Sequence, residues 1–240
     1  MTSPSPAAVT PSPVRVRVAG LARALIRPWQ EGYLSDQPPA VAALARLRRG
    51  AGHDAAQMPD LWGLVDTGPL HTAGPDTRML GEHELTRAED ALYAAVTLWA
   101  FHQQSRGTGM HRSHTPAQPA GLGAAVRRLM PADGIDEPVR KRLVRAGSAP
   151  DLATVTQRLR DLVALLRRAD IPLDYGLLAG QLYTWQWPDG PAAVRRQWGR
   201  SFHTTPPTSA PQPAAGDPDP THPDTGTSET RTPHTDKDAS

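Results

Sequence analysis

The sequence contains no cysteine among its 240 residues. This absence excludes a disulfide framework and thiolate catalysis, and it fits a protein of the reducing cytoplasm. Lysine is nearly absent too, because 24 of the 26 basic residues are arginines. No apolar run reaches the roughly 18 residues that a membrane span needs. The N-terminus also lacks the charged and apolar regions of a signal peptide. We therefore expect a cytoplasmic protein without membrane contact.

Motifs for catalysis and metal binding are missing as well. The zinc-protease helix, the phosphate-binding glycine-rich loop and the nucleophile elbow do not occur. His111 and His114 lie close together but without a neighbouring carboxylate, and residues 82–84 (Glu-His-Glu) mark a helix start, where acids are favourable anyway. We interpret His102 as a buried, hydrogen-bonded histidine. The sequence thus predicts a protein that is not an enzyme and that holds no cofactor or metal.

Charge is distributed unevenly along the chain. From Pro206 onward there are six acidic and two basic residues, a net charge of −4, which leaves +6 for residues 1–205. Residues 204–240 are mainly Pro, Thr, Ser, Asp and Gly, a composition that cannot offset the entropy of ordering. We predict a disordered acidic tail over 204–240 and a disordered segment over 1–13. One hypothesis for the tail is competition for the basic surface.

The body of the chain has the hydrophobic periodicity of an all-α helical bundle. Asp151 and Asp174 are expected helix N-caps. The stretch "VRVRV" alternates like a strand but has no partner, so we interpret it as an extended lead-in or a first helical turn. The predicted helices are 19–34, 38–49, 59–66, 84–104, 121–130, 136–146, 150–169, 174–186 and 190–203.

Loop lengths suggest that this bundle is divided into two lobes. Loops are short in the C-terminal half, whereas long loops around 50–83 and 105–120 are expected to be flexible. We predict an N-terminal helical lobe over residues 14–110 and a C-terminal helical lobe over residues 111–203.

The arginines fall on the polar faces of several predicted helices. In 190–203, Val194, Trp198 and Phe202 form an apolar stripe that we assign to the core, while Arg196 and Arg200 share another face. Like charges four residues apart repel in an isolated helix, and few acids compensate them. Genomic base composition alone can enrich arginine. Repeated uncompensated pairs nevertheless favour a polyanionic partner over a merely solvated surface.

Several segments resemble one known family, in the family's order. They are "VAALARLRRG" (41–50), "MPDLW" (58–62), "LWAFHQQ" (98–104), "GMHR" (109–112), "GLGAAVRRL" (121–129) and the continuous run 140–202. Over about residues 19–203 the chain is similar to the CasB family, the small subunit of the type I-E CRISPR surveillance complex, Cascade. Neither the proline-rich loop 113–121 nor the acidic tail is covered by what the resemblance implies.

The resemblance implies an all-helical, non-catalytic protein that pairs head-to-tail with a second copy of itself. It implies contacts with the backbone and large subunits of Cascade, with the crRNA and with the target DNA. Its basic surface would help to hold the target and displaced strands of the R-loop, through contacts that depend on salt and not on sequence.

The resemblance and the helix faces together select the residues expected to bind nucleic acid. Arg48 lies at the edge of an apolar face and is expected to be structural, and His111 with Arg112 are secondary candidates in a flexible loop. The candidate nucleic-acid-binding residues are Arg46, Arg49, Arg127, Arg128, Lys141, Arg142, Arg145, Arg167, Arg168, Arg196 and Arg200.

The alternative from another class is a helical, duplex-DNA-binding transcriptional regulator. Such a protein needs a recognition helix with base-reading side chains and is usually a symmetric dimer. None of the basic helices carries the mixture of Asn, Gln and Arg that base reading favours. An enzyme ranks third, since no acid/base constellation can be defended.

Overall fold

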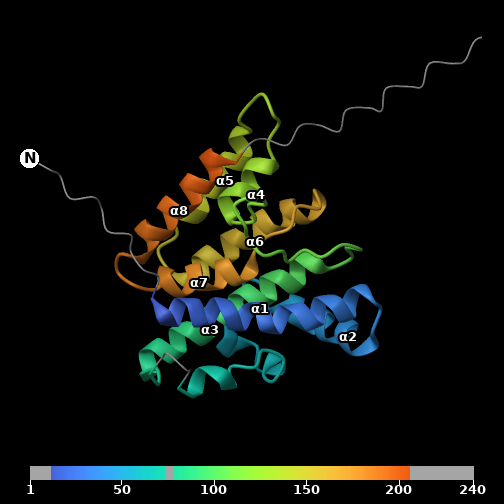
Figure 1. Cartoon of the computed structure of the whole chain (residues 1–240), viewed down its shortest axis with the longest axis vertical. Helices are drawn as coiled ribbons and strands as arrows, with labels where there is room; N and C mark the ends of the chain where they lie inside the picture. Colours follow the sequence, from blue (N-terminus) through green and yellow to red (C-terminus); the bar gives the residue numbers. More distant parts are fainter. Residues whose placement is uncertain (1–11, 74–77, 206–240) are drawn as a thin grey trace, which may run out of the picture. The chain divides into compact units, whose positions relative to one another are not determined.

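The structure, a computed structural model, describes residues 12–73 and 78–205. In these residues the regular structure is helical, apart from one isolated bridge between His111 and Leu173. Figure 1 shows the helices α1 (Pro13–Leu34), α2 (Pro38–Leu47), α3 (Glu82–Gln103), α4 (Leu122–Arg128), α5 (Glu137–Gly147), α6 (Leu152–Arg168), α7 (Tyr175–Trp185) and α8 (Gly190–Thr204). The all-α prediction is confirmed. Residues 1–11 and 206–240 lie outside the described residues, so the disorder predicted there stays a prediction, whereas Pro13 and Thr204, which the two predicted segments included, belong to α1 and α8.

The stretch "VRVRV" is the beginning of α1. Pro13 occupies the first turn of this helix, where a missing backbone N–H costs nothing. Val14, Val18, Ala22 and Ile26 follow at intervals of four and are all buried. Val14 and Val18 fit both the strand-like alternation and the four-residue spacing of a helix. For this reason residues 14–18 alone do not distinguish a strand from a helix.

The predicted helix 59–66 is wrong. This region contains only short 3-10 turns, at Ala55–Gln57, Pro59–Leu61 and Gly68–His71. Gly63 has a φ of 82°, a left-handed conformation that interrupts helical backbone and that glycine adopts without strain. The interruption leaves Trp62 with 71% of its surface exposed.

Helices α1, α3 and α7 pack against one another and form the centre of the described structure (Figure 1). Residues 91–100 of α3 are buried on every side of the helix. One continuous cluster of buried apolar side chains extends from Val14 in α1 to Phe202 in α8. Helices from both predicted lobes therefore contribute to a shared core. The lobe boundary near residue 110 stays a prediction.

Helix α8 is held by an aromatic stack and by close contact with α4. The rings of Trp185 and Trp198 stack with centroids 5.5 Å apart, and the indole N–H of Trp198 donates to Gln181 at 2.9 Å. A Cβ on Gly123 of α4 would lie 1.9 Å from the carbonyl oxygen of Trp198, so only glycine permits this crossing. Val194, Trp198 and Phe202 are buried, as predicted from their spacing.

The segment 105–120 is anchored, contrary to the expectation of a flexible loop. The Gln103 side chain accepts from the N–H of Met110 at 2.8 Å and donates to two carbonyls of the loop. The N–H of Leu173 donates to Met110, and that of Asp174 donates to Ala120. These hydrogen bonds attach segment 105–120 to the start of α7, so the backbone of this segment is held against the folded core.

Candidate nucleic-acid interface

A groove between α5 and α6 brings four arginines together around one hollow. Its volume is about 430 Å³, and four arginines and one acidic residue contribute to its walls. The lining residues are Arg142, Arg145, Thr154, Gln157, Arg158, Arg160 and Asp161. An excess of guanidinium groups over carboxylates in a hollow of this size favours phosphate, which each planar guanidinium can bind through two hydrogen bonds.

The sequence of α5 and α6 explains why these arginines face outward. Asp136 and Asp151 cap the two helices by accepting from the N–H groups of Val139 and Thr154, at 2.9 and 2.7 Å. The apolar faces turn inward, so the charged faces remain in water. Arg158 donates to the backbone carbonyl of Arg145 at 2.5 Å, which fixes α6 to α5 across the groove.

A second basic cluster lies where α6 ends beside the end of α3. The guanidinium groups of Arg160 and Arg167 each lie 4.7 Å from the ring centroid of Phe101. Arg167 also donates to the Phe101 carbonyl and to the Gln104 side chain, at 3.3 and 3.1 Å. Arg160 belongs both to the groove and to this cluster, so the basic surface continues from α5 along α6.

The electrostatics of Arg167 reflect this crowding. Burial lowers the pKa of Arg167, and the nearby charges of Arg106, Arg168, Arg160 and Arg48 lower it further. Arg106 is partly neutralised by Asp170, 3.1 Å away. The remaining positive charge has no matching acid in the described residues that surround it. An anionic ligand would relieve this repulsion.

The other predicted cations occupy separate places. Arg49 pairs with Asp60 at 2.6 Å, and Arg46 donates to the Asp60 carbonyl, so both are already engaged. Lys141 and Arg168 are exposed. Arg196 and Arg200 are exposed on α8, without a side-chain partner in the described part of the chain.

Two predicted arginines at the end of α4 are bound to backbone carbonyls. Arg127 donates to Pro131 at 3.1 Å, and Arg128 reaches Pro172 at 3.5 Å. Burial lowers the pKa of Arg128, and the charge of Arg112 adds to this effect. These two arginines help to close the loops around α4. Whether any of the eleven candidates binds nucleic acid stays a prediction.

The sequence did not single out Arg158 and Arg160 as groove residues. Arg160 and Arg167 are seven residues apart, a spacing that puts them on one face of a helix, and this spacing is the signal that the sequence offers. No sequence pattern revealed that α5 lies beside that part of α6. Arg48, expected to be structural, is exposed and belongs to the charges around Arg167.

His102 and His111 are engaged in the fold. His102 is fully buried, and its Nδ1 lies 2.8 Å from the Tyr175 hydroxyl. Burial lowers the pKa of His102 to about 3. The Nδ1 of His111 accepts from the Tyr175 N–H at 3.2 Å, so this ring anchors the loop.

Among residues 12–73 and 78–205, no three His, Asp or Glu side chains are grouped to hold a metal ion. No helix in this part is long and apolar enough to cross a membrane.

Comparisons with known proteins identify the family. Residues 43–203 match the family described as CRISPR-associated protein Cse2 (CRISPR_cse2). The crystal structure of CasB from Thermobifida fusca is 46% identical, with a TM-score of 0.67, over 81% of this chain and 100% of that chain. No curated protein sequence matches the chain.

Two further structures show the same fold. They are described as a CRISPR RNA-guided surveillance complex and as such a complex in a pre-nicking state. The matching chains are 21% and 23% identical, each with a TM-score of 0.54, over 78% of this chain and 93% of theirs. At these identities the similarity concerns the fold alone.

The helical fold, the outward-facing arginines and the buried neutral His102 define a helical structural protein with a basic surface. The chain belongs to the Cse2 (CasB) family, the non-catalytic small subunits of type I-E Cascade. This membership confirms the family resemblance found in the sequence and the expectation of a protein that is not an enzyme. It also leaves the transcriptional-regulator alternative without support.

Proposed function

We propose that this chain is the small subunit of a cytoplasmic CRISPR RNA-guided surveillance complex and that its basic surface on α5 and α6 binds the nucleic-acid backbone. The bound strands would be those of the R-loop, the target and the displaced strand. Exchange of a DNA duplex for a guide–target hybrid is nearly balanced in free energy. A few additional phosphate contacts therefore suffice to prolong the open state.

The observation that carries this proposal is the α5–α6 groove, in which four arginines surround a hollow with one acid. The groove lies on regular helices, so the backbone positions of its arginines are fixed. Gln157 is the one amide side chain among the four arginines that line the groove, and this excess of cations over amides favours backbone contact without sequence preference. Membership in the Cse2 family and the likeness to surveillance-complex chains support assembly with the backbone and large subunits, crRNA and a second copy.

The test is a salt titration of nucleic-acid binding by the full chain. Fluorescent single-stranded DNA, RNA and duplex of scrambled sequence are bound across a series of salt concentrations. Arg142→Gln with Arg145→Gln removes two groove cations without removing the arginine that fixes α6 to α5. Each phosphate contact contributes about 0.7–0.9 to the slope of log affinity against log salt. We expect the slope to fall by about 1.4–1.8.

The matched control also removes two positive charges. Arg27→Gln with Arg140→Gln alters exposed arginines that pair with Glu31 and Glu137. This control should retain most of the slope. Equal loss in both double variants would show that net charge alone governs binding, and an unchanged slope in the groove variant would overturn the proposal. Tight preference for one duplex sequence would indicate a regulator.

A further inference from the structure

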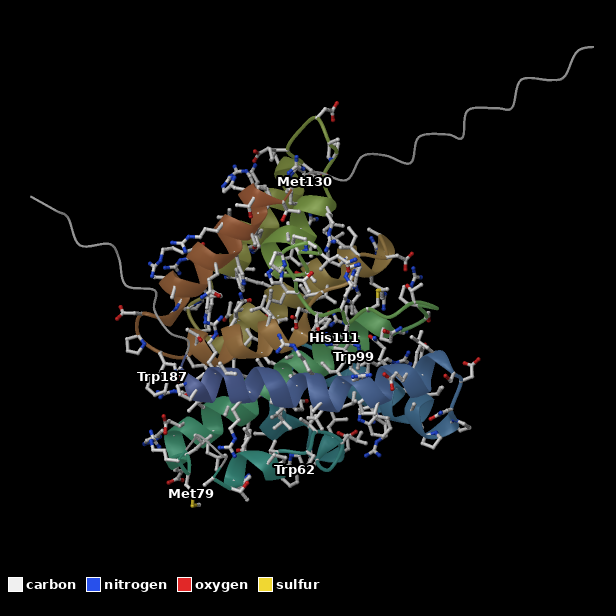
Figure 2. All side chains as sticks on the ribbon, viewed as in Figure 1. Trp62, Met79, Trp99, His111, Met130 and Trp187 are labelled. Carbon is white, nitrogen blue, oxygen red and sulfur yellow. The ribbon has the colours of Figure 1, made fainter. Side chains whose placement is uncertain are left out.

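The molecule also has a group of acidic residues where the segment between α2 and α3 packs against α3 and the start of α6. Two cavities, of about 280 and 130 Å³, lie on either side of Asp90 and Tyr93, and both residues line both cavities. The larger cavity includes Trp62 in its wall. Figure 2 shows Trp62 at the outer edge of this segment, in agreement with its 71% exposure.

Asp90 is the carboxylate that lines both cavities. Asp54 accepts from the N–H of Ala56, and Asp60 pairs with Arg49. Glu89 lies 2.9 Å from the His71 ring. Asp90 has no hydrogen-bond or ion-pair partner in the described part of the chain. Burial and the charges of Asp54 and Glu89 raise the pKa of Asp90 to about 6. A cation beside Asp90 would remove this penalty.

Buried hydroxyl groups provide an independent indication of a ligand. Tyr93 is only 6% exposed, yet its hydroxyl has no hydrogen-bond partner among residues 12–73 and 78–205. Thr156, which lines the smaller cavity, is 4% exposed and its Oγ1 is likewise unpaired. Buried polar atoms without partners cost about 1–3 kcal/mol each, so they are rare in folded proteins. Both residues line the smaller cavity, so a donor that enters it and displaces their side chains slightly can reach either hydroxyl.

We propose that the cavity pair at Asp90 and Tyr93 binds the guanidinium group of an arginine presented by a neighbouring protein chain. Guanidinium is a cation with donors only, which matches an acidic site that offers acceptors. Its flat face can stack on the exposed indole of Trp62. Nucleic acid is excluded as the occupant, because the surrounding carboxylates repel phosphate. The site therefore serves protein contact and is separate in chemistry from the α5–α6 groove.

The test uses the full chain labelled with 5-fluorotryptophan and observed by ¹⁹F NMR. The Trp62 resonance is assigned from a Trp62→Phe sample. The probe is N-acetyl-arginine amide, and N-acetyl-citrulline amide is its uncharged isostere. We expect a saturable shift of the Trp62 resonance with a dissociation constant of about 1–10 mM, as one charge-assisted contact and one stack allow. Citrulline should bind at least tenfold more weakly.

Asp90→Asn should abolish the arginine-dependent shift. The variant should also raise the Tm at neutral pH, because it removes a carboxylate whose ionisation the fold opposes, so loss of binding cannot be attributed to unfolding. Asp133→Asn, a change at an exposed acid between α4 and α5, is the matched control and should retain the shift. The proposal is overturned by equal responses to arginine and citrulline, or by an unchanged response in Asp90→Asn.

Assembly of the complex tests whether the partner of this site is a protein chain. With the other Cascade subunits, Asp90→Asn should lower the amount of this chain in the purified complex, whereas Asp133→Asn should not. Unchanged incorporation would overturn the role in protein contact, even if the free probe binds. The salt slope for nucleic acid should be the same in Asp90→Asn and the unaltered chain, so failure here is distinguishable from failure of the proposed function.

Discussion

His102 illustrates how burial decides the role of a single titratable residue. Its ring is fully enclosed and hydrogen-bonded to Tyr175, and its pKa falls from 6.5 to about 3 because water is excluded. The unfolded chain therefore binds a proton between these pH values that the folded chain rejects. Stability should fall as pH decreases from about 6.5 toward 3, by up to about 1.4 kcal/mol per pH unit from this residue.

This prediction is tested by urea unfolding across that pH range, with His102→Asn for comparison. The variant should be less stable at pH 7, but its stability should depend less steeply on pH. His111, whose pKa burial also lowers, contributes in the same direction in both proteins. An NMR titration of the unaltered chain should find the His102 ring neutral at pH 5. A protonated ring at that pH would contradict the account.

At the scale of helices, the α4–α8 crossing depends on a single missing side chain. A Cβ at Gly123 would lie 1.9 Å from the Trp198 carbonyl oxygen and 2.8 Å from the N–H nitrogen of Phe202. Gly123→Ala should force the two helices apart and destabilise the fold by about 1–3 kcal/mol, the usual cost of overpacking.

The control for this crossing lies on the other helix of the pair, α8. No atom lies within 4 Å of a Cβ built on Gly199, which is in the interior of α8. Gly199→Ala should therefore stabilise the protein by about 0.5–1 kcal/mol through helix propensity. Denaturant unfolding of both variants measures the difference. Destabilisation by Gly199→Ala, or none by Gly123→Ala, would show that the crossing is not as tight as the structure has it.

Helices were predictable from the sequence where capping residues and helix-ending residues lie next to them in the chain. Asp151 and Asp174 lie directly before α6 and α7 and accept from the backbone N–H groups of Thr154 and Leu177. These two capping residues made the start of both helices predictable from the sequence. The false helix at 59–66 had apolar residues at helical spacing, but the conformation of Gly63 overrode them. Local patterns predict a helix well where a cap and a stop agree.

The candidate site was predictable only in part, because it depends on packing between elements. Arg142 and Arg145 were chosen from the charged face of α5, and they do line the groove. Arg158 and Arg160 complete it because α6 lies beside α5, a contact that no local pattern encodes. Arg128 looked exposed on its helix, but it is half-buried against the Pro172 carbonyl. Helix periodicity predicts on which face of a helix a side chain lies. It does not predict which other element packs against that face.

For the whole molecule, the separation of charge is the feature with functional consequences. The groove and the cluster around Arg167 are basic, while Asp90 and the acids around it lie on α3 and on the segment between α2 and α3. One chain can thus attract phosphate at one surface and a cation at another. This division fits a subunit that has both nucleic acid and protein as neighbours.

The acidic tail adds a prediction at this scale. Residues 206–240 carry a net charge of −4 and the rest of the chain +6. If the tail competes for the basic surface, deletion of 206–240 should raise nucleic-acid affinity at low salt, with a smaller effect at high salt because charges are screened. Fluorescence anisotropy at two salt concentrations measures this effect. Equal affinity with and without the tail at low salt would exclude competition.

The most direct test of the central claim is the lifetime of the R-loop on an assembled surveillance complex. Complexes are prepared with the unaltered subunit, with Arg142→Gln and Arg145→Gln, and with the control pair Arg27→Gln and Arg140→Gln. Incorporation of each subunit is verified before a matched target is bound and the decay of the open state is followed. The account predicts a lifetime at least several-fold shorter for the groove variant alone. Equal lifetimes in all three complexes, with equal incorporation, would contradict a role for the α5–α6 groove in holding the strands.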